Sequence, residues 1–187
     1  MKILVLCYEY PPVGGGGGRV AASVGAGLAE RGHEVKVVSA GLRHLPRRAV
    51  IEGVEVLRPE SYRQREDTCS VREMALYLAT SFFPALRLCR SWKPDVIHAH
   101  FVVPTGALAL ALHWLTGIPY VLTAHLGDVP GGVPEQTDKL FRWLGPFIRP
   151  IWKNAAAVTA VSGFVAELAE KNCRVSAKVI LNGVPML

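Results

Sequence analysis

Residues 2–40, KILVLCYEYPPVGGGGGRVAASVGAGLAERGHEVKVVSA, contain two short apolar runs separated by a glycine run and an amphipathic segment. Lys2–Cys7 and Val35–Ala40 have the apolar, β-branched composition of buried strands. Arg19–Arg31 repeats apolar residues at helical spacing, and Gly32 follows it as a helix stop signal. This order predicts two parallel strands joined by a crossover helix.

The rest of the chain repeats the alternation of strand-like and helix-like segments. The further expected strands are Val54–Arg58, Val96–His100, Tyr120–His125, Ala157–Val161 and Lys178–Leu181, and the further expected helices are Val71–Arg90, Thr105–Leu115, Asp138–Lys153 and Val165–Asn172. We therefore predict a doubly wound parallel sheet in a Rossmann-like α/β domain. Val96–Gly127 lacks Asp, Glu, Lys and Arg, but its changing pattern favours strand, helix and strand over a membrane span. Ser61–Thr68 is polar and is predicted to be a mobile loop.

Composition narrows the class of protein. The 187 residues predict one domain, and 50% hydrophobic with 19% charged residues excludes a disordered chain. The net charge of +6 favours an anionic partner and leaves nucleic acid, a phosphate-bearing substrate and an acidic membrane surface open. The four cysteines are scattered without metal-ligand spacing. Their pattern argues against zinc and against a secreted disulfide scaffold, and it predicts a cytoplasmic protein.

The glycine run Gly14–Gly18 stands between the first strand and the first helix. Without side chains, a phosphate can approach the helix N–H groups there, and Gly15 and Gly16 are the best candidates. The dinucleotide fingerprint G-x-G-x-x-G fails, because Arg19 and Val20 stand where its last glycine should be. No Gly-Lys pair occurs, so a P-loop is excluded as well.

Polar residues follow the ends of three expected strands. Glu9, His100 and His125 stand at or just past carboxyl ends, where open α/β sheets bind ligands. A histidine there can donate a hydrogen bond to a sugar hydroxyl and can change protonation near neutral pH. The alternative is that each histidine is a structural residue. His98 shares a strand face with His100 and is expected to pack beneath the site.

Blocks spread along the chain resemble the family-4 retaining glycosyltransferases and occur in the same order as in that family. They are Tyr10-Pro11-Pro12 with Gly15-Gly16, Arg31-Gly32-His33-Glu34-Val35, Pro94-Asp95-Val96-Ile97-His98-Ala99-His100, Tyr120-Val121-Leu122-Thr123-Ala124-His125 with Asp128, Ala157-Val158-Thr159-Ala160-Val161-Ser162, and Val179-Ile180-Leu181-Asn182-Gly183-Val184. No single block is specific, but their combination spans almost the whole chain.

The resemblance implies roles for individual residues. Gly15 and Gly16 match the loop that faces the diphosphate of a nucleotide-sugar donor. His125 matches a histidine that reaches the transferred sugar, so it is predicted as the catalytic residue. His100 and Asp128 match positions that line the same cleft, as Glu9 is expected to do from its place after the first strand.

The resemblance also implies an architecture and a reaction. Residues 1–187 are expected to be the N-terminal, acceptor-side domain of a two-domain GT-B enzyme whose C-terminal, donor-binding domain would follow Leu187. The enzyme would transfer a sugar with retention of configuration, and the leaving phosphate would help to remove the acceptor proton. The sequence contains no D-x-D motif, so neither a metal nor another cofactor is expected. Residues 1–187 alone are predicted to fold, to be inactive and to bind a nucleotide sugar no better than about millimolar.

The expected partners are a nucleotide sugar, a sugar or lipid-linked acceptor and the missing domain, with no nucleic acid. Basic and aromatic residues interleave over residues 139–153, so peripheral contact with the inner face of the membrane is a further prediction. The alternative interpretation of this segment is an ordinary helix whose aromatic side chains pack in the core. Two other functions stay open: a stand-alone sugar- or phosphate-binding α/β module, and a GT-B nucleotide-sugar epimerase.

Overall fold

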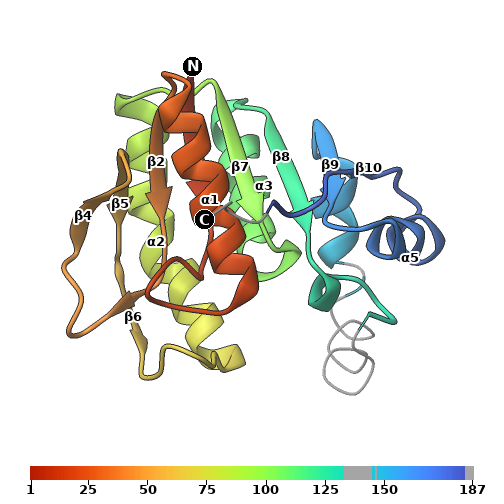
Figure 1. Cartoon of the computed structure of the whole chain (residues 1–187), viewed down its shortest axis with the longest axis horizontal. Coiled ribbons are helices and arrows are strands. Elements are labelled where there is room, and N and C mark those ends of the chain that lie inside the picture. Colours follow the sequence, from red (N-terminus) through yellow and green to blue (C-terminus); the bar gives the residue numbers. More distant parts are fainter. Residues whose placement is uncertain (133–144, 146, 184–187) are drawn as a thin grey trace.

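The computed structural model describes residues 1–132, 145 and 147–183. In this part of the chain, one eight-stranded sheet has the order β10-β9-β8-β7-β1-β2-β5-β4 (Figure 1). Its strands are β1 (Lys2–Leu6), β2 (Glu34–Val38), β4 (Arg48–Ile51), β5 (Val54–Leu57), β7 (Val96–His100), β8 (Tyr120–Ala124), β9 (Ala157–Ala160) and β10 (Lys178–Val179). Only the edge pair β4 and β5 is antiparallel. The predicted α/β sheet is confirmed.

Helices cover both faces of the sheet, as the alternating side chains of β1 require. Ile3 and Val5 belong to a core cluster under α1 (Gly16–Glu30), whereas Leu4 and Leu6 belong to the larger cluster on the other face. The larger cluster also contains residues of α2 (Val71–Ser91), α3 (Ala107–Thr116), α5 (Gly163–Cys173) and the helical residues 147–153. Figure 1 shows α1 in front of the sheet, with α2 and α3 behind it.

One loop prediction was wrong. The start of the expected mobile segment, residues 61–63, belongs to strand β6 (Glu60–Arg63), which pairs with β3 (Gly41–Leu42) in a small second sheet. Ser61 is fully buried and its hydroxyl donates to the carbonyl of Gly41 at 2.9 Å. Arg63 is also buried. The polar composition hid these contacts, because polar side chains that bond to backbone carbonyls can be buried at little cost.

Residues 139–144 and 146 of the basic and aromatic segment lie outside the described residues. In its described part, Trp152 is 2% exposed and packs in the core, whereas Phe147 is 74% exposed. The apolar and aromatic side chains of this segment therefore do not all face outwards. No helix among the described residues is long and apolar enough to cross a membrane.

Candidate functional site

The candidate site lies at the carboxyl edge of the sheet, where β8, β7 and β1 end side by side. These strands are parallel neighbours, so the segments that follow them meet at one edge. Glu9 follows β1, Phe101 follows β7 and His125 follows β8. The rings of Phe101 and His125 are stacked with their centroids 4.5 Å apart.

Phe101 connects His125 to the glycine run. A Cβ atom at Gly17 would lie 2.3 Å from Cζ of Phe101, so the ring lies directly against the first turn of α1. On its other side Phe101 meets Tyr8 edge to face at 5.0 Å between centroids. Its φ of 73° lies in the left-handed region, which costs a non-glycine residue about 1 kcal/mol or more. Sequence analysis missed Phe101, because no neighbouring residue signals that conformation.

Three glycines of the run are required by the packing of the protein itself. Gly14 has φ of 94°, and a Cβ there would lie 2.4 Å from Cβ of Glu9. A Cβ at Gly17 would collide with Phe101, and one at Gly18 would lie 2.9 Å from the carbonyl oxygen of Glu9. These three positions explain most of the run without any ligand.

Gly15 and Gly16 differ from the other three glycines. A Cβ at either position would have no heavy atom within 4 Å. Gly15 precedes α1 as its N-cap residue, and Gly16 is the first residue of that helix. The first N–H groups of a helix have no intrahelical acceptor, and they carry the positive end of its dipole. The two glycines expected to face a diphosphate are thus the two that open towards solvent.

Glu9 supplies an anion to this helix terminus. Its Oε2 accepts a hydrogen bond from the backbone N–H of Gly15 at 3.1 Å, and its Oε1 lies 3.9 Å from Nη2 of Arg63. The amide expected to face a donor phosphate is therefore bonded to the protein's own carboxylate. A phosphate that uses the N–H of Gly15 must displace Glu9, whereas one that uses Gly16 can bind beside it.

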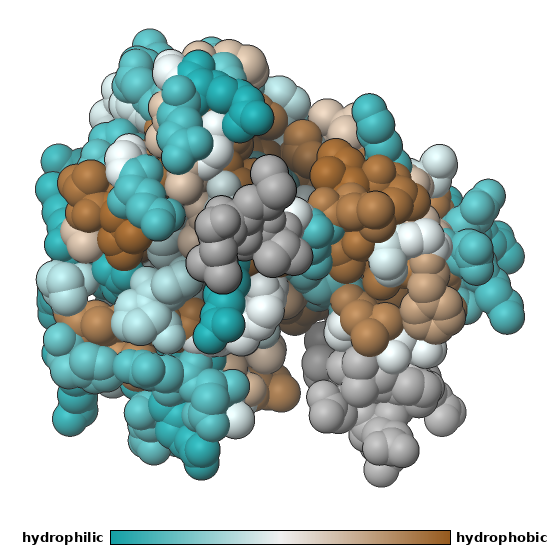
Figure 2. Space-filling view, in the orientation of Figure 1, coloured by the Kyte–Doolittle hydropathy of each residue, from teal (hydrophilic) through white to brown (hydrophobic). Residues whose placement is uncertain are grey.

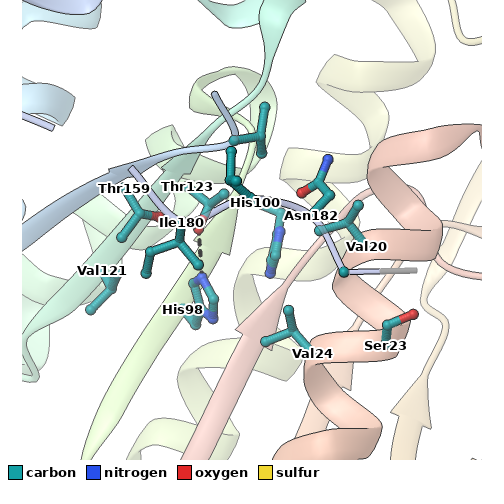
Figure 3. A pocket seen from close by; sticks show the side chains of 13 residues that line it. Val20, Ser23, Val24, His98, His100, Val121, Thr123, Thr159, Ile180 and Asn182 are labelled. Atoms are coloured by element: carbon teal, nitrogen blue, oxygen red, sulfur yellow. Dashed lines mark hydrogen bonds between the residues drawn. The ribbon is translucent and has the colours of Figure 1, made fainter. Parts of the chain in front are cut away.

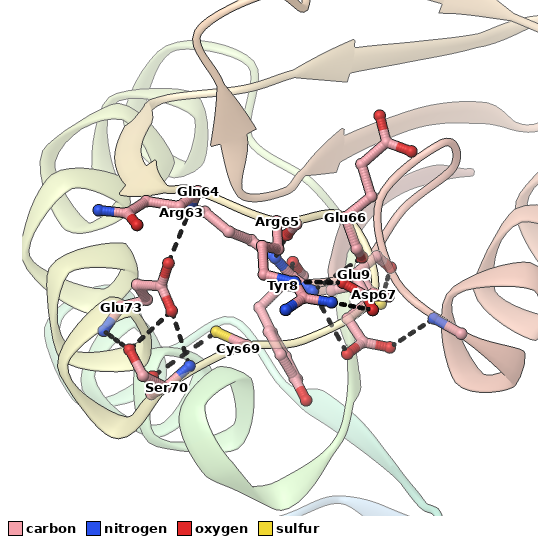
Figure 4. Close-up of polar contacts among 12 residues, drawn as sticks. Tyr8, Glu9, Arg63, Gln64, Arg65, Glu66, Asp67, Cys69, Ser70 and Glu73 are labelled. Carbon is pink, nitrogen blue, oxygen red and sulfur yellow. Dashed lines mark hydrogen bonds and ion pairs between the residues drawn. The ribbon is translucent and has the colours of Figure 1, made fainter.

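Arg63 is a second residue that sequence analysis missed. Its side chain is fully buried, and its guanidinium donates to the carbonyls of Arg65 at 2.8 Å, Glu66 at 3.1 Å and Tyr8 at 3.4 Å. Figure 4 shows this guanidinium among Tyr8, Glu9 and the loop that leads to α2. Arg63 therefore fixes the loop around the Glu9 carboxylate. Only the pairing of β6 with β3 reveals that Arg63 anchors this loop, because the sequence around Arg63 is uniformly polar.

The histidines form a row beneath the edge. The ring centroids of His98 and His100 are 4.3 Å apart, and those of His100 and His125 are 5.8 Å apart. Burial lowers the pKa of His98 and His125 to about 4, and it lowers the pKa of His100 well below its usual value. All three are neutral at pH 7, so the titration near neutral pH that was expected of His100 and His125 is wrong.

His98 and His100 are bonded differently. His98 Nε2 lies 2.8 Å from Oγ1 of Thr123, which in turn lies 2.8 Å from Oγ1 of Thr159, so His98 has a structural partner. Within the described residues, neither ring nitrogen of the buried His100 has a hydrogen-bond partner. Nε2 of His125 is likewise without one. These buried nitrogens have hydrogen-bonding capacity that no described residue satisfies.

Asp128 connects the backbone segments that follow β7 and β8. It is 4% exposed, and its Oδ1 and Oδ2 accept from the backbone N–H groups of Val102 and His125, each at 2.9 Å. Burial raises the pKa of this carboxyl group to about 7 against the opposing effect of these hydrogen bonds. Asp128 was expected to line the cleft. That role stays a prediction; in the structure Asp128 ties the segment after β7 to the segment after β8, and so it positions His125.

A pocket of about 440 Å³ opens under α1, on the face of the sheet that this helix only partly covers. His98 and His100 point into it between α1 and the segment that carries Ile180 and Asn182 (Figure 3). In the orientation of Figure 1, apolar residues gather on the surface around β10 and α5 (Figure 2). Phe164 and Leu181 are exposed in these segments. No group of three His, Cys, Asp or Glu among the described residues is placed to hold a metal ion.

Comparison with known families matches residues 14–186 to the model of Glycosyltransferase Family 4. A glycogen synthase of Mycobacterium tuberculosis is 35% identical over 167 residues, which cover 77% of this chain and 40% of that protein. A protein of Bacillus subtilis, named as the teichuronic acid biosynthesis glycosyltransferase TuaC, is 35% identical over 97 residues, or 52% of this chain and 24% of that one. The chain thus spans less than half the length of these curated relatives.

Among solved structures, the chain is similar to a sucrose-phosphate synthase of Thermosynechococcus elongatus. The TM-score is 0.72 at 18% identity, and the match covers 96% of this chain and 47% of that one. At this identity the likeness concerns the fold alone.

Proposed function

The chain belongs to glycosyltransferase family 4, and we propose that it forms the acceptor-side domain of a retaining glycosyltransferase that uses a nucleotide sugar. One observation carries the proposal: Phe101 at the carboxyl edge contacts both the glycine run that opens α1, through Gly17, and the neutral His125. A helix terminus binds diphosphate, and a neutral histidine offers hydrogen bonds to an uncharged sugar. Together they fit the two halves of a nucleotide-sugar donor.

The proposed division of labour follows from what the site contains. The N–H group of Gly16, joined by that of Gly15 once the phosphate displaces Glu9, stabilises the charge that grows on the leaving diphosphate, while His125 contacts the transferred sugar. Asp128 keeps His125 in place through its backbone. A second, donor-binding domain would recognise the base and the ribose. The leaving phosphate would take the acceptor proton, so the reaction would need neither a separate general base nor a metal.

Donor consumption by the full-length protein tests the proposal. Incubation with UDP-, ADP-, GDP- and TDP-sugars, each with and without candidate acceptors, is expected to release nucleoside diphosphate from at least one of them. Proton NMR of the product is expected to show the donor's anomeric configuration, and EDTA is expected to leave the rate unchanged. An inverted product would contradict retention. A free epimerised sugar would point to an epimerase, and binding without turnover would point to a sugar-binding module.

Gly16→Ala and Gly17→Ala form a matched pair. A methyl group at Gly16 meets no protein atom but occupies the path of a phosphate, so we expect an unchanged melting temperature and an approximately tenfold or greater loss in kcat/KM for the donor. A methyl group at Gly17 collides with Phe101, so that variant is expected to melt at a lower temperature. Full activity of a folded Gly16→Ala enzyme would remove the glycine run from the donor site.

Location in the cytoplasm and contact with the membrane surface are part of the proposal. The described part of the basic and aromatic segment supports that contact through the exposed Phe147, Arg149 and Lys153. The buried Trp152 does not contribute to it.

A further inference from the structure

A groove of about 930 Å³ lies beside the site, on the other side of the loop that Arg63 anchors. It is formed by β3, β6, the loop that follows β6 and the first turns of α2. Its walls are rich in arginine side chains, which are Arg43, Arg63, Arg65 and Arg72. Hydrophilic residues cover this end of the molecule, where β6 lies in Figure 1 (Figure 2).

The acidic groups around the groove are engaged by other partners. Glu73 accepts from the backbone N–H of Gln64 at 2.9 Å and of Ser70 at 2.7 Å, as part of the N-terminal cap of α2. Asp67 forms a two-pronged ion pair with Arg65 at 2.9 and 3.0 Å. Figure 4 shows these carboxylates turned towards their own partners.

The remaining pairs leave two cations without a counter-charge. Glu66 lies 3.1 Å from the ring of His44, and Arg63 faces Glu9. Arg43 and Arg72 are exposed, and neither has an ion-pair or hydrogen-bond partner among the described residues. The residues that line the groove include four arginines and one carboxylate, that of Glu73, so an anion bound between Arg43 and Arg72 would gain two charge-assisted contacts.

The groove and the candidate site share one wall. Arg63 lines the groove and pairs with Glu9, whose carboxylate caps Gly15. Three residues further on, the carbonyl of Glu66 accepts the backbone N–H of Gly14 at 2.6 Å. The segment between β6 and α2 therefore has one side against the glycine run and the other side in the groove, so a ligand in the groove lies next to the proposed donor diphosphate.

We propose that this groove binds the acceptor and that the acceptor is a sugar carrying a phosphate or carboxylate group, held by Arg43 and Arg72. The inference rests on the proposed glycosyltransferase function and adds the charge class of the substrate. The volume suits a mono- or disaccharide. Tyr62, which is 53% exposed, and Leu76 supply apolar surface in the same groove for the face of a sugar ring.

Calorimetric titration of the full-length protein tests the proposal with glucose 6-phosphate, glucose 1-phosphate and glucuronate, each against glucose and inorganic phosphate. At least one charged sugar is expected to bind more tightly than both glucose and inorganic phosphate, and to bind less tightly as salt is added. The double variant Arg43→Gln/Arg72→Gln is expected to weaken that binding tenfold or more. Arg72→Lys keeps the charge but loses the planar fork of the guanidinium. Its affinity for the charged sugar is expected to lie between those of the wild type and the double variant.

Arg87→Gln is the matched control, because Arg87 is also exposed on α2 but lies 15 residues further along, about 22 Å away by helix rise. The Arg87→Gln protein is expected to bind the charged sugar with the affinity of the wild type. Equal binding of glucose and the charged sugars, or charged-sugar binding that the double variant retains, would overturn the proposal. So would binding of inorganic phosphate as tight as that of any charged sugar.

Hydrolysis of the donor without any acceptor separates the two levels of inference, since it needs no ligand in the groove. Donor hydrolysis without binding of a charged sugar would reject the anionic acceptor and leave the glycosyltransferase standing. Binding of a charged sugar that depends on Arg43 and Arg72, without consumption of any donor, would leave the groove as an anionic-sugar site and reject its role as acceptor site.

Discussion

Replacing His125 by alanine is expected to lower the turnover of the full-length enzyme by about 100-fold or more, the scale of a lost contact in the transition state. His125 is 8% exposed, and its buried Nε2 has no partner among the described residues. Burial keeps it neutral at pH 7, so it can donate a hydrogen bond to a sugar hydroxyl without adding charge. Turnover is measured at saturating donor, with circular dichroism to establish that the variant is folded.

His33→Ala serves as the control, because His33 precedes β2 at the opposite edge of the sheet and contacts the N-terminus of the chain. It is expected to retain full turnover. The separation of kcat from KM distinguishes the role of His125 from a structural one, since loss of a contact made only in the transition state lowers kcat with little change in KM. A folded His125→Ala enzyme with wild-type kcat would remove His125 from the reaction.

The fold could be predicted because hydrophobic periodicity decides it locally. The strands β1, β2, β7, β8 and β9 were all expected within a residue or two of their observed bounds, since buried parallel strands are continuous apolar runs. The start of α1 was placed three residues late, at Arg19 instead of Gly16. Glycine has low helix propensity, and only the packing of Gly17 against Phe101 and of Gly18 against Glu9 shows why it is needed in that first turn.

The candidate site was predictable only in its location. The parallel sheet expected from the sequence brings the carboxyl ends of its strands, and so Glu9 and His125, to one edge. Phe101 and Arg63 were missed, because their importance comes from contacts with residues far along the chain, and a left-handed φ or a buried guanidinium leaves no local pattern. The same holds for the protonation of the histidines, which depends on burial by several elements at once.

That burial makes stability depend on pH in a defined direction. The folded protein is expected to lose stability as the pH falls from about 6.5 to about 4, because the buried His98, His100 and His125 stay neutral while the same side chains take up protons in the unfolded chain. For His125, the difference between 6.5 and about 4 corresponds to about 3 kcal/mol. Urea unfolding at a series of pH values gives the slope of stability against pH.

Asp128 acts in the opposite direction over the same range. The pKa of its carboxyl group is about 7 in the fold and 3.8 without burial, so between these values the folded protein holds a proton that the unfolded chain has released. Its contribution is fully present below 3.8 and is lost as the pH rises through about 7. Asp128 therefore offsets part of the acid destabilisation caused by the three histidines.

The variants His100→Asn and Asp128→Asn separate the two effects. His100→Asn removes one buried imidazole, so its stability is expected to change less steeply between pH 4 and 6.5 than that of the wild type. Asp128→Asn removes the opposing group, so its stability is expected to change more steeply over this range. The variant also loses one carboxylate acceptor, which lowers its stability at pH 7 without affecting this expectation. The slope is the readout, because a uniform loss of packing shifts each curve without tilting it. Three parallel curves would mean that these groups are not buried as described, and the electrostatic account of the site would then be wrong.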